Sequence, residues 1–92
     1  MRRLPILFAL LATPALASSE DAWQEFRQLT ESSCLALIDM PGEVTIEVNP
    51  FGSDQFGVAL LSVTTAAGTD RMACIMNKQT GAAELTAPFT NQ

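Results

Sequence analysis

The stretch EVTIEVNPFGSDQFGVALLSVT, residues 43–64, decides the fold. Over residues 43–48 apolar and polar side chains alternate, which predicts a strand with one buried and one solvated face. Residues 56–64 are largely apolar at both parities, which is typical of a central strand. The connection from Asn49 to Gly57 contains a proline and two glycines, and it is longer than a hairpin requires. The stretch therefore predicts two neighbouring strands joined by a wide loop.

An amphipathic helix is expected before these strands, from about Asp21 to Ile38. Trp23 and Phe26 belong to a set of apolar residues at helical spacing, and acidic and amide side chains occupy the other face. The run Met40-Pro41-Gly42 is a helix stop signal. We expect Trp23 and Phe26 to pack into the core, and a binding stripe is the alternative.

Two more strands are expected after residue 64, over residues 71–77 and 82–86. Gly68 and Gly81 offer the positive φ that the intervening hairpin turns demand. The predicted fold class is α+β, with one N-terminal amphipathic helix packed on a four-stranded antiparallel β-meander. Residues 18–92 should form a single small domain.

The two cysteines, Cys34 and Cys74, predict a disulfide that joins the helix to the third strand. A domain of this size buries little apolar surface, and closing such a loop contributes roughly 4 kcal/mol. A redox pair is the alternative, but the C-x-x-C spacing is absent. Because side chains alternate along a strand, Met72 and Met76 should share the helix-facing side with Cys74.

The first 17 residues have the pattern of a cleaved secretory signal. Two arginines precede an apolar run from Leu4 to Ala12, and small residues follow at Ala15 and Ala17. The run is shorter than the ~20 residues of a membrane-spanning helix, so a retained anchor is the weaker alternative. We expect the chain to be periplasmic or secreted, with no membrane insertion after cleavage.

Charge and composition exclude several kinds of function. Removal of Arg2 and Arg3 leaves three basic residues against ten acidic ones, a side-chain charge of −7. Such a domain repels nucleic acid and anionic membranes and attracts basic partners, although acidity that serves solubility alone is the alternative. The chain has no histidine, which excludes histidine-dependent catalysis and histidine-ligated metals. We expect no catalytic residues, no metal and no cofactor.

An apolar patch should remain on the face of the sheet that the helix does not cover, because one helix covers one face. Such patches mark interaction surfaces, and the partner would be another exported protein or a second copy. It would bind this face or add a strand to an edge of the sheet. Alternatively, the tail from Ala87 to Gln92 folds back and places Phe89 on the patch. Either Phe56, Val58 and Leu60 or Ala59, Leu61 and Val63 should point away from the helix, and the sequence leaves this choice open. The candidate contact residues are Ile75, Ala73, Leu61, Val63, Phe56 and, near the tip of the Asn49–Gly57 loop, Phe51.

Two other sites remain as alternatives. The Asn49–Gly57 loop offers oxygen atoms from Asn49, Ser53 and Asp54 for calcium or a small ligand, although it lacks the final glutamate of an EF-hand and the lysine of a phosphate loop. Glu43 and Glu47 share one strand face and form the only carboxylate pair suggested for acid–base catalysis.

The segment IMNKQTGAAEL, residues 75–85, resembles the last hairpin of exported PepSY-type modules. The element order is also similar to that of lactamase-inhibitor-type modules, which pack one helix on an antiparallel sheet. Lys78, Thr80 and Gly81 match the turn motif, and Asn77 stands where an aspartate is usual. The resemblance implies binding or inhibition of another protein and transfers no catalytic residues.

Overall fold

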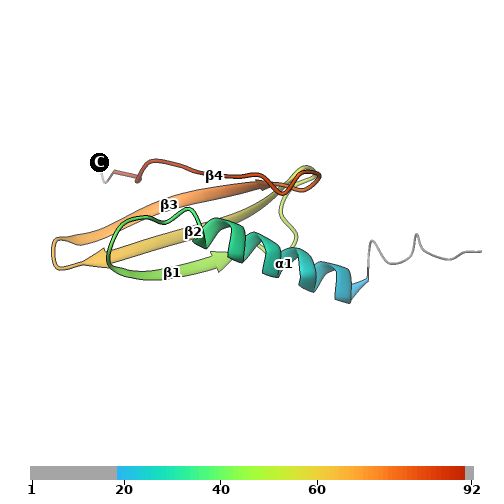
Figure 1. Ribbon diagram of the computed structural model, residues 1–92, viewed down its shortest axis with the longest axis horizontal. Helices are drawn as coiled ribbons and strands as arrows, with labels where there is room; N and C mark the ends of the chain where they lie inside the picture. Colours follow the sequence, from blue (N-terminus) through green and yellow to red (C-terminus); the bar gives the residue numbers. More distant parts are fainter. Residues whose placement is uncertain (1–18, 91–92) are drawn as a thin grey trace, which may run out of the picture.

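The computed structural model describes residues 19–90 and confirms the predicted α+β architecture (Figure 1). The elements are α1 (Glu20–Leu35), β1 (Glu43–Val48), β2 (Phe56–Thr65), β3 (Gly68–Asn77) and β4 (Ala83–Leu85). The strands form one antiparallel sheet in the order β1-β2-β3-β4. The predicted signal, residues 1–17, and its cleavage point before Ser18 lie outside the described residues.

Helix α1 begins where the sequence places its cap and ends earlier than predicted. The Ser19 side chain accepts a hydrogen bond from the Ala22 N–H at 3.1 Å, and two acidic residues follow in the first turn. The helix stops at Leu35, because the next N–H groups bond to carbonyls only three residues back: Leu37 N–H donates to Cys34 O, and Ile38 N–H to Leu35 O. The chain then crosses to β1 through Gly42, whose φ is 138°.

The core lies between α1 and one face of the sheet. Cys34 and Cys74 form the predicted disulfide, and both are 0% exposed. Met72 and Met76 are buried on the same side as Cys74, as strand alternation predicts. The other buried apolar residues are Ala59, Leu61 and Val63.

Two of the candidate contact residues are therefore misplaced in the sequence-based prediction. Leu61 and Val63 are each 1% exposed and belong to the set of β2 residues that faces α1. The even-numbered and the odd-numbered residues of β2 are both largely apolar, so the sequence pattern alone could not predict which set faces α1. The register decides, because Leu61 lies beside Met72, on the face that the disulfide assigns to the helix. The opposite set, which contains Phe56 and Leu60, faces away from α1.

Close approach between α1 and β2 depends on a glycine. A Cβ atom added to Gly57 would lie 2.6 Å from the Thr30 hydroxyl oxygen and 3.0 Å from the Phe26 ring. Thr30 is itself fully buried, and its hydroxyl donates to the Phe26 carbonyl at 2.9 Å. Only glycine lets the helix backbone come this close to the sheet without displacing either side chain.

Within residues 19–90, no helix is long and apolar enough to cross a membrane. The disulfide is compatible with a location outside the cytoplasm, where such bonds persist.

The first prediction concerns the disulfide. The double variant Cys34→Ala/Cys74→Ala should lose about 4 kcal/mol of unfolding free energy, since the bond closes a loop with a sequence separation of 40. For a domain of this size the loss corresponds to a fall in Tm of roughly 15–30 °C, measured by circular dichroism. Wild-type protein refolded under reducing conditions is the control, because it keeps both side chains and lacks only the bond. An unchanged Tm in both samples would show that the bond contributes nothing.

Candidate functional site

The sheet face opposite α1, called the back face below, carries the exposed apolar residues of the sheet. Leu60 on β2 is 56% exposed and Ile75 on β3 is 38% exposed. Ala73 lies directly beside Leu60 in the register, and Phe56 occupies the end of β2 nearest the long loop. Three exposed acidic residues border this apolar centre. They are Glu43 and Glu47 on β1 and Glu84 on β4.

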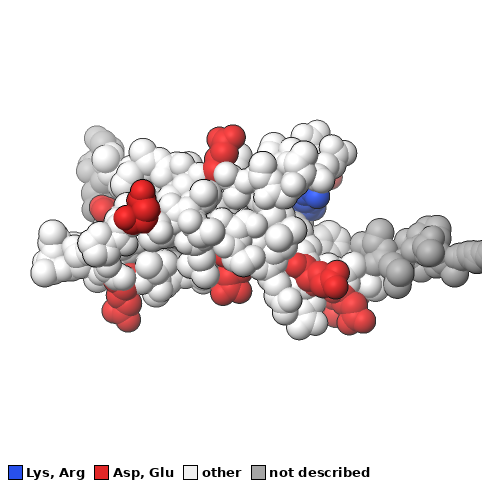
Figure 2. Space-filling model, in the orientation of Figure 1, with Lys and Arg blue, Asp and Glu red and all other residues white. Residues whose placement is uncertain are grey.

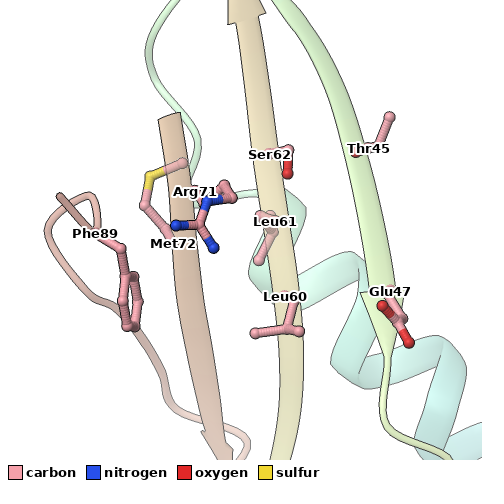
Figure 3. Close-up of a pocket in the computed structure, with 8 residues that line it drawn as sticks. All are labelled: Thr45, Glu47, Leu60, Leu61, Ser62, Arg71, Met72 and Phe89. Carbon is pink, nitrogen blue, oxygen red and sulfur yellow. The ribbon is translucent and has the colours of Figure 1, made fainter. Parts of the chain in front are cut away.

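A hollow of about 240 Å³ lies on the back face (Figure 3). Leu60 rises from its middle, Phe89 stands at one side and Glu47 at the other. The remaining residues that line it are Thr45, Leu61, Ser62, Arg71 and Met72. Ligand pockets in proteins usually measure ~300–1,000 Å³. The hollow is therefore closer in size to a seat for one side chain than to a pocket for a whole small molecule.

The C-terminal tail closes the outer edge of β3 and leaves the back face open. Thr86 N–H donates to the Ala73 carbonyl, and Phe89 N–H donates to the Arg71 carbonyl, each at 2.8 Å. These bonds extend the short strand β4 along its neighbour. Phe89 remains 55% exposed and Leu60 56% exposed, so the tail flanks the apolar centre without covering it. We expected Phe89 to drop onto the patch. It reaches only the rim of the hollow.

The Asn49–Gly57 loop is a structured turn fastened to the rest of the domain by Lys78. The ammonium group of Lys78 donates to the Phe51 carbonyl at 3.0 Å and to the Ser53 carbonyl at 2.6 Å. The same nitrogen lies 5.3 Å from the centre of the Trp23 ring and 5.0 Å from that of Phe26. We call these four side chains, Trp23, Phe26, Phe51 and Lys78, the loop cluster.

The loop cluster corrects the expectation for Trp23 and Phe26 and shows where Phe51 lies. Trp23 and Phe26 do not enter the deep core; they are half-buried and pack edge to face with each other, with ring centres 5.5 Å apart. Phe51 packs edge to face on Trp23 at 4.9 Å, so it does not belong to the back face with Ile75 and Ala73. The role of Lys78 could not be seen in the sequence, because the carbonyls and rings that it contacts lie more than 20 residues away along the chain.

Two of the three side chains that suggested a calcium or ligand site, Asn49 and Ser53, use their oxygen atoms within the protein. The Asn49 side-chain oxygen accepts from the N–H groups of Phe51 and Gly52, at 3.2 and 2.8 Å. The Ser53 hydroxyl oxygen accepts from Phe56 N–H at 3.1 Å, and its carbonyl oxygen is bound by Lys78. Across residues 19–90, no cluster of three or more histidine, cysteine, aspartate or glutamate residues could hold a metal ion. The loop geometry is explained by its own hydrogen bonds.

Glu43 and Glu47 lie on the back face, as the alternation predicts, but they are separated along β1. Four residues of extended chain place their Cα atoms roughly 13 Å apart, from a rise of about 3.3 Å per residue. Only Glu47 lines the hollow. The two carboxylates therefore do not converge on one point, as an acid–base pair acting on one bond would require.

Negative charge dominates the surface. The described residues include all ten acidic residues of the chain and three basic ones, which are Arg27, Arg71 and Lys78. Acidic side chains emerge on several sides of the molecule in Figure 2, whereas blue is confined to one place. Lys78 is engaged with the loop, and Arg27 pairs with Glu20 at 2.5 Å. A basic partner would meet an attractive field over much of the surface.

Comparisons with family models, with curated proteins and with solved structures gave no match. Functional inference for this chain therefore starts from its own surfaces.

The second prediction tests the anchoring of the loop. Lys78→Met keeps the aliphatic part of the side chain but removes the ammonium group that makes both hydrogen bonds to the loop. The unfolding free energy should therefore fall by about 1–2 kcal/mol. Amide hydrogen exchange of loop residues 51–55 should accelerate. Gln79→Met, which alters an exposed side chain in the same turn, is the matched control and should change neither quantity. Equal effects of the two substitutions would show that Lys78 has no special role.

The third prediction concerns calcium. Because the Asn49 and Ser53 oxygens already accept hydrogen bonds from the protein, and Asp54 supplies only a single carboxylate, adding millimolar calcium should leave Tm unchanged. A binding ion would raise Tm, and the rise would continue with the logarithm of calcium concentration above Kd. Magnesium serves as the control for nonspecific ionic effects. A rise with calcium alone would restore the loop as an ion site.

Proposed function

We propose that this chain is a non-enzymatic, exported module that binds another protein through the back face of its sheet. The observation that carries the proposal is the exposure of Leu60 and Ile75 on a face that neither α1 nor the tail covers. An apolar centre rimmed by charged residues is the usual composition of a protein-binding surface.

The hollow supports the proposal that the back face binds a protein. Its volume of about 240 Å³ suits one inserted side chain, and its walls combine aliphatic, aromatic and charged groups. A partner side chain entering between Leu60 and Phe89 would be surrounded by apolar surface, with the Glu47 carboxylate at the margin of the hollow for its polar end. Buried anchors of this kind dominate the affinity of many interfaces.

Charge defines the partner further. With side-chain charges of −7 over residues 19–90, and with three glutamates around the apolar centre, the surface favours a basic protein and disfavours nucleic acid and anionic lipid. The predicted signal sequence and the disulfide support a periplasmic or secreted location. The resemblance to PepSY-type and lactamase-inhibitor-type modules implies binding or inhibition of another protein, and it belongs to this proposal.

The fourth prediction compares exposed apolar residues on opposite sides of the molecule, Leu60 and Ile75 on the back face and Leu29 on α1. Immobilised protein is incubated with the exported proteins of the cell that makes it, and captured proteins are quantified by mass spectrometry. Leu60→Thr and Ile75→Thr, which retain strand propensity, should each reduce capture by roughly tenfold or more, as expected for a central apolar contact. Leu29→Gln, on the outer side of α1 and 48% exposed in the wild type, should have no effect.

The same experiment separates the alternatives. Capture lost only with Phe51→Ser would assign binding to the loop. Capture reduced equally by Leu29→Gln, or the absence of any captured protein, would count against the back face.

A further inference from the structure

The two edges of the sheet differ in whether another segment of the chain hydrogen-bonds to their outward backbone groups. On the β4 side, the tail supplies hydrogen bonds to the outward-facing backbone of Ala73 and Arg71. On the other side, β1 is an edge strand: it pairs with β2, and no strand among residues 19–90 pairs with its outer side. In Figure 3, which looks onto the back face, β1 forms the margin of the sheet beside the hollow.

The register identifies which backbone groups of β1 face outward. Asn49 N–H donates to the Val58 carbonyl at 2.8 Å, one step beyond the pair Val48 and Ala59. Bonded and non-bonded pairs alternate in an antiparallel ladder. Glu47, Thr45 and Glu43 therefore direct their backbone N–H and C=O groups toward β2. The groups of Val44, Ile46 and Val48 point away from the sheet.

We propose that β1 accepts an extended, basic segment of a partner protein as an additional antiparallel strand. This inference rests on the proposed protein-binding function and specifies how the partner docks. The added strand would bond to the outward backbone groups of Val44, Ile46 and Val48 and would continue the back face beyond β1.

The glutamates specify the side chains of the added strand. Glu43 and Glu47 occupy positions that do not hydrogen-bond to the new strand, where facing side chains lie closest, with Cβ atoms about 4.5–5.5 Å apart. Lysine or arginine opposite each glutamate forms a favourable cross-strand pair. Residues between them point to the other face, where Val44, Ile46 and Val48 lie half-buried. The fitting segment thus alternates basic and apolar residues.

The same geometry disfavours a second copy of the chain at this edge. Symmetric pairing centred on Thr45 sets Glu43 opposite Glu47, and pairing centred on Glu47 sets that residue opposite itself. Like charges placed directly opposite are destabilising. Pairing centred on Ile46 avoids placing two glutamates directly opposite each other, but it leaves Glu47 and its copy as diagonal neighbours. The two chains would also repel each other, because each carries a strong negative charge. Edge glutamates protect a strand against self-association while leaving it open to a basic strand.

The fifth prediction uses synthetic peptides of alternating lysine and valine, acetylated and amidated at their ends. With lysines facing the glutamates, the valine N–H groups point to β1 and the lysine N–H groups point away. N-methylation of the valines should weaken binding by at least about tenfold, because it removes the bonding donors. N-methylation of the lysines, which adds the same number of methyl groups, should leave affinity within about twofold. Titration calorimetry measures both, on unaltered protein.

Hydrogen exchange locates the peptide on the protein. The amides of Val44, Ile46 and Val48 should gain protection when the peptide binds, whereas residues of α1 should not change. Glu47→Gln should weaken binding severalfold, and Glu25→Gln, on the exposed side of α1, is the matched control.

Several results would overturn the inference: equal affinity of the two methylated peptides, no binding at millimolar peptide, or protection at another surface. A dimer of the protein that protects the same three amides without peptide would assign the edge to a second copy. Loss of the captured partner with Leu60→Thr, combined with indifference to N-methylation, would retain back-face binding and reject strand addition alone.

Discussion

A single helix can cover only one face of a four-stranded sheet, and the Cys34–Cys74 disulfide determines which face that is. The bond joins the last turn of α1 to β3, so Met72 and Met76, which flank Cys74 and share its side of the strand, are buried with it. The register then transmits this choice to β2 and β1, because residues that lie side by side share a face. The exposed apolar centre of the back face is the direct consequence.

Much of this arrangement could be predicted from the sequence, because its signals are local. Alternation over residues 43–48, the two cysteines and the turn glycines Gly68 and Gly81 predicted the sheet, the bond and the hairpins. The face of β2 could not be predicted, since both of its parities are apolar and the choice depends on register with β3. The exposed Leu60 was missed as a contact residue for that reason, and the buried Leu61 was included wrongly.

The long loop shows a different limit of sequence reasoning. Its glycines and polar residues resemble a ligand loop, but its form depends on Lys78, which lies 25 residues further along the chain than Ser53. Gly52 also has a positive φ of 69°, and a Cβ atom there would approach the Phe56 carbonyl oxygen to 2.1 Å. The composition that suggested a ligand site thus serves a tight reversal of the chain. Contacts between distant segments explain it, and local patterns do not reveal them.

The aromatic contacts of Trp23 give the protein an intrinsic optical reporter. It is the only tryptophan in a chain without tyrosine, so near-ultraviolet emission arises essentially from this indole. Its ring touches Phe51 and lies beneath the Lys78 ammonium group, whereas the back face lies across the sheet from α1. Fluorescence will therefore respond to movement of the loop and remain nearly silent to events on the opposite face. Movement of the loop can thus be followed on its own, without attaching a dye.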